Sequence, residues 1–174
     1  MFNTAFDGLT DNTLDFYPAD LRTGIDEVNA RVYETVNNGV YRSGFATSQT
    51  AYDEAVRALF DSLDWLEDRL SGQRYLMGAR LTEADWRLFT TLVRFDAVYV
   101  GHFKCNIRRL MDYPNLWAYA REIYAMPGVA DTVRFDIYKQ GYFSPSELRN
   151  PLGIVPAGPV IDWTAPHGRG QSAA

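Results

Sequence analysis

The feature that most constrains the fold is a helix-start signal followed by an apolar helix, in residues 80–95. Thr82 and Asp85 stand three positions apart. At this spacing the two side chains can hydrogen-bond to each other's backbone N–H groups, as in a capping box with Asp in place of the usual Glu. Beyond this cap, apolar residues occupy much of the helix circumference, which is typical of a helix enclosed by others. We therefore predict an all-α domain with this helix at its centre.

Two further helices are predicted on the N-terminal side of the central helix. Apolar residues at helical spacing run through residues 18–36, and the Asn-Asn-Gly sequence at 37–39 is typical of a left-handed helix stop. We expect residues 40–47 to form a short connector. The next apolar stripe, residues 52–70, follows Thr47 or Ser48 as a cap and ends at Gly72.

The C-terminal half shows shorter helical segments and then a tail rich in proline and glycine. Pro114 is suited to the first turn of a helix, and the Pro-Gly pair at 127–128 ends that helix. Residues 129–142 can form one or two short helices. The tail from residue 150 mixes prolines and glycines with apolar residues, so we expect an extended arm across the surface. Only residues 168–174 look free.

These signals divide the chain into three parts. Residues 1–17 are an extended lead-in, residues 18–149 an all-helical domain, and residues 150–174 a C-terminal arm and tail. The whole chain of 174 residues has the size of one domain with a single core.

The charge and composition argue against several classes of protein. The net charge is −5 and the longest basic run is the pair at 108–109, so we expect neither nucleic acid nor an anionic membrane as a partner. The sequence shows no apolar run long enough to span a bilayer and no secretory leader, which predicts a cytoplasmic protein. Cys105 is the only cysteine and cannot form an intrachain disulfide, which fits a reducing compartment.

Few residues suggest catalysis or metal binding by themselves. His102, Cys105 and His167 do not form a cluster of the kind that binds metals, so we predict no metal site. Basic neighbours could lower the pKa of the Cys105 thiol and make it a nucleophile. Cysteine is nevertheless among the residue types most often buried, and we favour a structural role for Cys105.

Tyrosine is abundant, with eleven residues in the chain. A phenol presents a flat apolar face and a hydrogen-bonding hydroxyl, which suits an aromatic, oxygenated ligand. Tyr41 lies in the predicted connector and Tyr142 near the end of the last helical segment. Most tyrosines fill the core, so composition and spacing alone give no reason to single out these two.

Several sequence blocks carry a resemblance to a known family. They are Val-Asn-Asn-Gly-Val-Tyr at 36–41, Leu-Thr-Glu-Ala-Asp-Trp-Arg-Leu-Phe at 81–89, Tyr-Val-Gly-His-Phe-Lys-Cys-Asn at 99–106, Tyr-Pro-Asn-Leu at 113–116 and Asn-Pro-Leu-Gly-Ile-Val-Pro at 150–156. Together they resemble the C-terminal domain of the glutathionyl-hydroquinone reductases, the Xi class of glutathione transferases. The Thr-x-x-Asp cap indicates only the wider superfamily, whereas its combination with the Gly-His-Phe-Lys-Cys-Asn block is specific. The resemblance covers residues 6–169, nearly the whole chain.

The resemblance implies a helical domain that carries the wall of an aromatic substrate site. Family members use a second glutathione to convert glutathionyl-hydroquinones into free hydroquinone and oxidised glutathione, and we expect a homodimer. The family's substrate-contacting tyrosines match Tyr41 and Tyr142. The second match is weaker, because the preceding residue is commonly His in the family and is Gly141 here.

One departure limits what the resemblance implies. In this family the nucleophilic cysteine and the glutathione-binding groups belong to an N-terminal thioredoxin-like domain, which these 174 residues do not contain. Cys105 does not inherit the role of that nucleophile, so we expect glutathione to be a co-substrate of the full-length enzyme and the isolated chain to be inactive. The alternative is a free-standing, non-catalytic module for binding or assembly. Both interpretations predict a face that meets a partner domain or chain.

Overall fold

The computed structural model of this chain describes residues 5, 7–9, 11 and 14–169. Within these residues the chain is helical, with three isolated β-bridges and no β-strand. The all-α prediction is confirmed. In chain order the elements are η1 (Asp7–Leu9), α1 (Arg22–Val32), η2 (Tyr33–Asn37), α2 (Gly39–Phe45), α3 (Gln49–Ser71), α4 (Glu83–Arg94), η3 (Phe95–Tyr99), α5 (Val100–His102), η4 (Leu110–Asp112), α6 (Pro114–Tyr124), α7 (Val129–Thr132) and α8 (Phe135–Tyr142).

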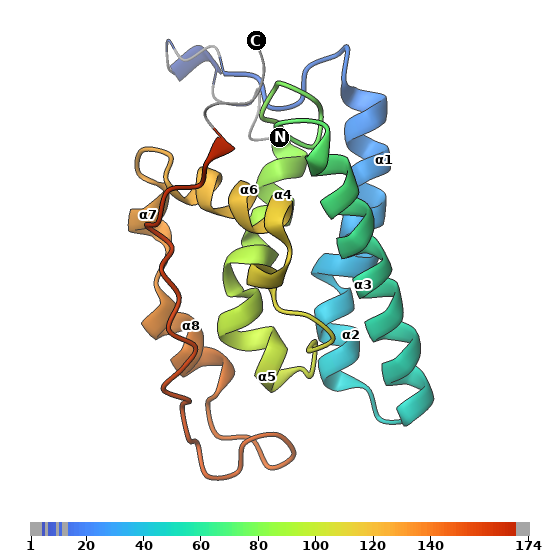
Figure 1. The fold of residues 1–174 in the computed structure, drawn as a ribbon, viewed down its shortest axis with the longest axis vertical. Coiled ribbons are helices and arrows are strands. Elements are labelled where there is room, and N and C mark those ends of the chain that lie inside the picture. Colours follow the sequence, from blue (N-terminus) through green and yellow to red (C-terminus); the bar gives the residue numbers. More distant parts are fainter. Residues whose placement is uncertain (1–4, 6, 10, 12–13, 170–174) are drawn as a thin grey trace.

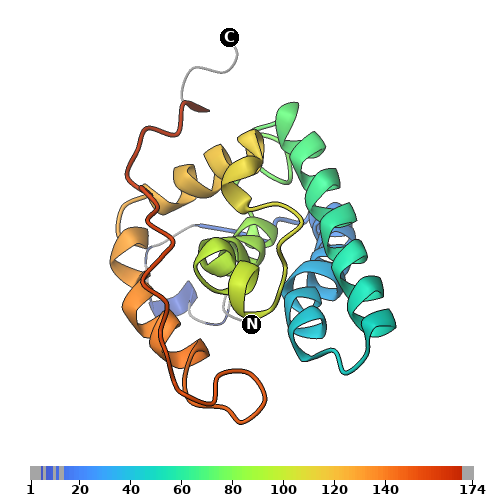
Figure 2. The same cartoon turned by 60° about the horizontal axis from the view of Figure 1, so that its bottom comes forward.

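Helix α4 lies at the centre of the domain, as the sequence predicts. Helices α1 to α3 pack on one side of it, and α6 to α8 cover the other side (Figure 1). When the molecule is turned, α4 and α5 are surrounded by the remaining helices (Figure 2). Leu88 and Leu92 of α4 are fully buried, and all five residues of η3 that continue it are buried. The central helix is therefore part of the core around most of its circumference.

The cap predicted at the start of α4 is present and is shared with two other segments. The carboxylate of Asp85 accepts hydrogen bonds from the Thr82 N–H at 2.8 Å and the Leu76 N–H at 2.9 Å. The Tyr119 hydroxyl of α6 donates to the same carboxylate at 2.9 Å. Burial raises the pKa of Asp85, while these hydrogen bonds act in the opposite direction. Asp85 thus joins the start of α4, the turn before it and α6.

The predicted helix stop at residues 37–39 and the connector at 40–47 are wrong. Helix α1 continues through η2, a π-helix, and α2 begins at Gly39. Asn38 keeps a helical backbone, with φ −84° and ψ −26°. The side-chain amide of Asn37 donates to the Arg87 carbonyl at 3.1 Å and to Thr91 Oγ1 at 2.6 Å. Asn37 therefore binds to α4, and this tertiary contact replaces the local stop that Asn and Gly otherwise favour.

Helix α1 begins at Arg22, four positions after the predicted start at residue 18, whereas the start and end of α3 and the start of α6 agree with the structure. The Ser48 hydroxyl caps α3 by accepting a hydrogen bond from the Ala51 N–H at 3.2 Å, and Gly72 follows the last residue of α3. Helix α6 begins at Pro114. Residues 129–142 form two short helices, α7 and α8.

The C-terminal arm runs beside α7 and α8 in both views (Figures 1 and 2). Trp163 is 6% exposed, and its ring lies 4.8 Å from the ring of Trp117 in α6 and 5.8 Å from that of Phe135 in α8. The Lys139 ammonium also donates to the Ala157 carbonyl at 2.9 Å. The buried Trp163 ring and the Lys139 hydrogen bond therefore help to attach the arm to α6 and α8.

Both ends of the chain fall partly outside the described residues. The predicted lead-in, residues 1–17, is described only in part, and of the predicted free tail only residues 168 and 169 are described. Near the end of the lead-in, the Phe16 carbonyl accepts a hydrogen bond from the Glu83 N–H of α4 at 2.9 Å. The division into three parts stays a prediction. Across the described part of the chain, no helix combines the length and apolar character that crossing a membrane requires.

Candidate functional site

The structure brings together the two tyrosines that the sequence comparison with the Xi class singled out. Tyr41 lies on α2 with 37% of its surface exposed, and Tyr142 is the last residue of α8. Their hydroxyl oxygens are 2.5 Å apart. The two residues therefore present one joint polar group from opposite sides of α4, although their role in substrate binding stays a prediction.

A third tyrosine, not predicted from the sequence, completes this group. The hydroxyl of Tyr99 lies 3.0 Å from that of Tyr142, and Tyr99 is almost fully buried at the end of η3. We refer to Tyr41, Tyr99 and Tyr142 as the tyrosine cluster. Tyr99 opens one of the sequence blocks that resemble the Xi class, but nothing in its local sequence distinguishes it from the tyrosines of the core.

Aromatic rings pack against the tyrosine cluster. The Phe103 ring lies 5.4 Å from that of Tyr41 and stacks on that of Tyr99 at 5.5 Å. The Phe45 ring stacks on that of Tyr41 at 6.2 Å and also contacts the Phe103 ring, at 5.3 Å. A Cβ atom at Gly44 would overlap the Phe103 ring, so this close packing requires glycine at that position. The cluster is held by a packed aromatic layer.

Two π-helical turns affect the directions of the Tyr41 and Tyr99 side chains. Tyr41 follows η2, and Tyr99 is the last residue of η3. A π turn holds an additional residue within the helix, and such turns are frequent at functional sites. Each additional residue rotates the side chains that follow by about 100° around the helix axis. Periodicity alone therefore does not predict the directions of these side chains.

The phenols of Tyr99 and Tyr142 are neutral and can donate hydrogen bonds. Burial raises the pKa of Tyr99 and of Tyr142, and the hydrogen bond between Tyr142 and Tyr41 raises the pKa of Tyr142 further. Because an ordinary tyrosine pKa is already about 10, both groups keep their protons near neutral pH. These two phenols can therefore donate hydrogen bonds or a proton, but they do not act as bases.

Beside the cluster lies a cavity of about 400 Å³, which we call the tyrosine cavity. Tyr41, Tyr142, Arg94 and Tyr138 line it, together with Ile137 and Gly141. The Arg94 guanidinium lies over the Tyr138 ring at 4.7 Å and donates to the Thr90 carbonyl at 2.6 Å. Aromatic faces, phenol hydroxyls and one cation suit a flat, oxygenated ring.

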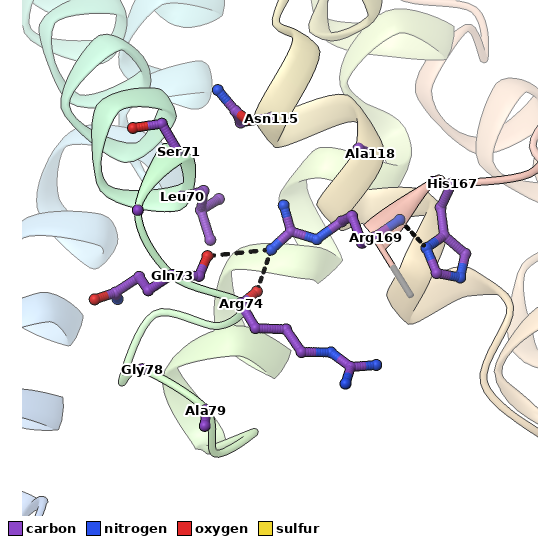
Figure 3. Close-up of a pocket in the computed structure, with 12 residues that line it drawn as sticks. Leu70, Ser71, Gln73, Arg74, Gly78, Ala79, Asn115, Ala118, His167 and Arg169 are labelled. Carbon is purple, nitrogen blue, oxygen red and sulfur yellow. Dashed lines mark hydrogen bonds between the residues drawn. The ribbon is translucent and has the colours of Figure 1, made fainter. Parts of the chain in front are cut away.

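A larger cavity of about 620 Å³ lies near the C-terminal end of α3 and is lined by different residues (Figure 3). Arg169 of the arm donates to the buried Glu122 carboxylate at 2.8 Å and to the Gln73 carbonyl at 3.3 Å. Arg74 donates to Glu122 as well, at 2.6 Å. Because these cationic groups already bind Glu122 or backbone carbonyls, this region attaches the arm to the domain.

Cys105 has the environment of an unreactive thiol. It is fully buried, and its backbone N–H donates to the Tyr99 carbonyl at 3.0 Å. Burial raises the pKa of the Cys105 thiol to about 12, so almost no thiolate exists near neutral pH. Among the side chains that the structure describes, no group of three or more His, Cys, Asp or Glu residues is arranged to hold a metal ion.

The comparisons with known proteins agree with the helical fold. Residues 49–122 match the family model described as "Glutathione S-transferase, C-terminal domain". The glutathionyl-hydroquinone reductase YqjG of Escherichia coli is 57% identical over 169 residues, which cover 97% of this chain and 52% of that protein. The Xi-class transferase of Natrialba magadii superposes with a TM-score of 0.94 at 48% identity, covering 97% of this chain and 52% of that one. The chain belongs to the Xi-class glutathione transferase family, as a C-terminal domain.

One further relative and a solved structure of YqjG extend the comparison. The glutathionyl-hydroquinone reductase PcpF of Sphingobium chlorophenolicum is 56% identical over 160 residues, covering 92% of this chain and 51% of that protein. A structure of Escherichia coli YqjG with bound glutathione superposes with a TM-score of 0.94 at 57% identity, covering 97% of this chain and 55% of that one. The chain spans about half the length of the curated relatives that it matches.

Proposed function

We propose that this domain forms the hydroquinone-binding wall of a glutathione-dependent reductase, which releases glutathione from glutathionyl-hydroquinones. The observation that carries the proposal is the hydroxyl network of Tyr41, Tyr99 and Tyr142 beside a cavity that also contains Arg94. Relatives that are named glutathionyl-hydroquinone reductases support it.

The geometry supports a definite role for the tyrosine cluster. When a thiolate attacks the glutathione sulfur of the substrate, a new S–S bond forms and the bond between sulfur and the ring carbon breaks. This happens from the keto tautomer of the ring, in which the carbon that bears sulfur is tetrahedral, so the electron pair passes into an enolate and the charge rests on a ring oxygen until that oxygen takes up a proton. Neutral phenols that donate hydrogen bonds to a ring oxygen, with the Arg94 cation nearby, stabilise this charge as it develops.

The thiol chemistry belongs to a partner domain in this proposal. Cys105 is buried and protonated, so the attacking thiolate and the glutathione site come from a thioredoxin-like domain. The 174-residue chain alone therefore binds a hydroquinone but does not turn over its glutathione conjugate. The resemblance to the Xi class supports a homodimer in the cytoplasm for the complete enzyme.

A chimera tests the proposal directly. This chain would replace the C-terminal half of Escherichia coli YqjG, with which it shares 57% identity. The chimera should release glutathione from a glutathionyl-hydroquinone, and Tyr142→Phe should lower that rate. Tyr33→Phe, at an exposed position of η2, is the matched control.

Two results would contradict the proposal. Turnover by the isolated chain would show that it contains its own nucleophile. A folded chimera without activity would instead favour a non-catalytic binding module.

A further inference from the structure

A second cavity lies next to the tyrosine cavity and has a different character. It measures about 570 Å³, and its walls include Trp86, Phe89 and Val93 of α4, with Val129 and Val133 from the segment around α7. Phe89 and Val93 are buried to 5% and 3% exposure. We call it the apolar cavity. Its size is within the range of small-molecule sites, and its walls are suited to hydrocarbon.

The two cavities have two residues in common. Arg94 and Tyr138 line both, and the Arg94 guanidinium lies over the Tyr138 ring at 4.7 Å. This stacked pair therefore stands between the tyrosine cluster and the apolar cavity. A ligand that passes it contacts hydroxyls at one end and hydrocarbon at the other.

The spacing along α4 sets the length of such a ligand. Trp86, Phe89, Val93 and Arg94 follow one another at helical spacing, so they lie along one face of the helix. Eight residues separate Trp86 from Arg94, which corresponds to about 12 Å along the helix axis. That length exceeds a single hydroquinone ring and leaves room for a substituent.

We propose that the apolar cavity is a second subsite, which takes an apolar substituent of the hydroquinone. The substituent is a second aromatic ring or a short hydrocarbon chain, and it passes the Arg94–Tyr138 pair while the hydroxylated ring stays at the tyrosine cluster. The inference rests on the proposed function, because it takes the position of the hydroxylated ring from it. It deepens that function by naming a substrate class, the hydroquinones with an apolar substituent.

Binding to the 174-residue chain tests the inference without turnover. Calorimetric titrations in anaerobic buffer would compare hydroquinone with phenylhydroquinone. A single methylene in a hydrophobic site changes affinity by about tenfold or more. Phenylhydroquinone should therefore bind at least tenfold tighter than hydroquinone. The indole N–H signal of Trp86, assigned with Trp86→Phe, should move in NMR spectra with phenylhydroquinone and not with hydroquinone.

A variant that fills the apolar cavity supplies the contrast. Thr90 lines this cavity and is exposed, so Thr90→Phe adds a ring there without changing the core. The affinity ratio of the two ligands should fall to about twofold, because the added ring takes the space of the phenyl substituent and removes most of its apolar contacts. Thr50→Phe makes the same substitution at an exposed position of α3 and should keep the ratio of the unchanged chain.

The outcomes separate this inference from the proposed function. Equal affinity for the two ligands, or a ratio that Thr90→Phe leaves unchanged, overturns the second subsite. If Tyr142→Phe still weakens hydroquinone in that case, the proposed function stands. If Tyr142→Phe weakens neither ligand, the ring is not held at the tyrosine cluster, and both the proposed function and the inference fail.

Discussion

The hydroxyl oxygens of Tyr41 and Tyr142 lie 2.5 Å apart, although 101 positions separate the two residues in the sequence. They meet because α2 and α8 pack at the same end of α4, where η3 places the Tyr99 hydroxyl 3.0 Å from that of Tyr142. The hydroxyls of Tyr41 and Tyr99 both contact that of Tyr142, and Tyr41 and Tyr142 line the tyrosine cavity. The site is thus assembled from three segments that are distant in sequence.

Removing one hydroxyl should weaken hydroquinone binding and leave the fold intact. We expect Tyr142→Phe to lower the affinity of the chain for hydroquinone by about three- to tenfold, the effect of one lost neutral hydrogen bond. Calorimetric titration measures it, and circular dichroism checks the helical content. Tyr33→Phe, which removes an exposed hydroxyl on η2, should leave the affinity unchanged. Equal losses in both variants would contradict a specific role for the cluster.

The raised tyrosine pKa values predict how stability depends on pH. Burial keeps the pKa of Tyr99 and Tyr142 above the ordinary value in the folded chain, whereas both phenols ionise at about 10 when the chain unfolds. Their contribution to stability is therefore complete below that value and is lost as the pH rises above it. Urea unfolding between neutral and alkaline pH measures this fall. The fall should be shallower in Tyr142→Phe. If the variant and the unchanged chain showed the same pH dependence, Tyr142 would not contribute to the fall.

The sequence predicts the long, regular parts of this fold well, for physical reasons. The stripe of α3 and the Thr82–Asp85 cap depend on residues that are close in sequence, so local patterns are sufficient. Helix α2 was missed because Asn37 binds Arg87 and Thr91 of α4, a contact that no local pattern reveals. The local stop signal is overridden by tertiary structure.

The candidate site was only partly predictable, and the reason differs for each residue. The resemblance to the Xi class points to Tyr41 and Tyr142, but no periodicity argument does. Tyr99 and Arg94 were missed because their roles depend on the π turn of η3 and on the packing of α8, which fix side-chain directions.

Gly44 should be the least tolerant position near the site. A Cβ atom there overlaps the Phe103 ring, which supports Tyr41 and Tyr99, so Gly44→Ala must move the ring or the helix. We expect a loss of about 1–3 kcal/mol in the free energy of unfolding. Urea unfolding measures this change, and hydroquinone affinity should fall with it.

The matched control for Gly44→Ala is Gly141→Ala. Nothing lies within 4 Å of a Cβ atom at Gly141, which belongs to α8. Alanine should stabilise this helix by about 0.5–1 kcal/mol. Similar losses at both glycines would show that the overlap with Phe103 does not determine the effect.

Cys105 should resist alkylation in the folded chain. Its thiol is fully buried and burial raises its pKa to about 12, so both access and thiolate are lacking at mildly alkaline pH. Mass spectrometry after iodoacetamide treatment should show almost no adduct. The same treatment in guanidinium chloride should modify the thiol fully. Rapid labelling of the folded chain would contradict the structural role of Cys105 and favour a nucleophilic one.

Asp85 should be the carboxylate on which the fold depends most. Its side chain is fully buried and accepts hydrogen bonds from Leu76, Thr82 and Tyr119, so Asp85→Ala leaves several buried donors without their acceptor. Each such donor costs about 1–3 kcal/mol, which predicts a total loss of at least about 3 kcal/mol in urea unfolding. Glu54→Ala, at an exposed position of α3, should stay within about 0.5 kcal/mol of the unchanged chain. Because Asp85 joins α4 to α6 and to the turn before α4, an unfolding midpoint equal to that of Glu54→Ala would mean that these segments are held by apolar packing alone.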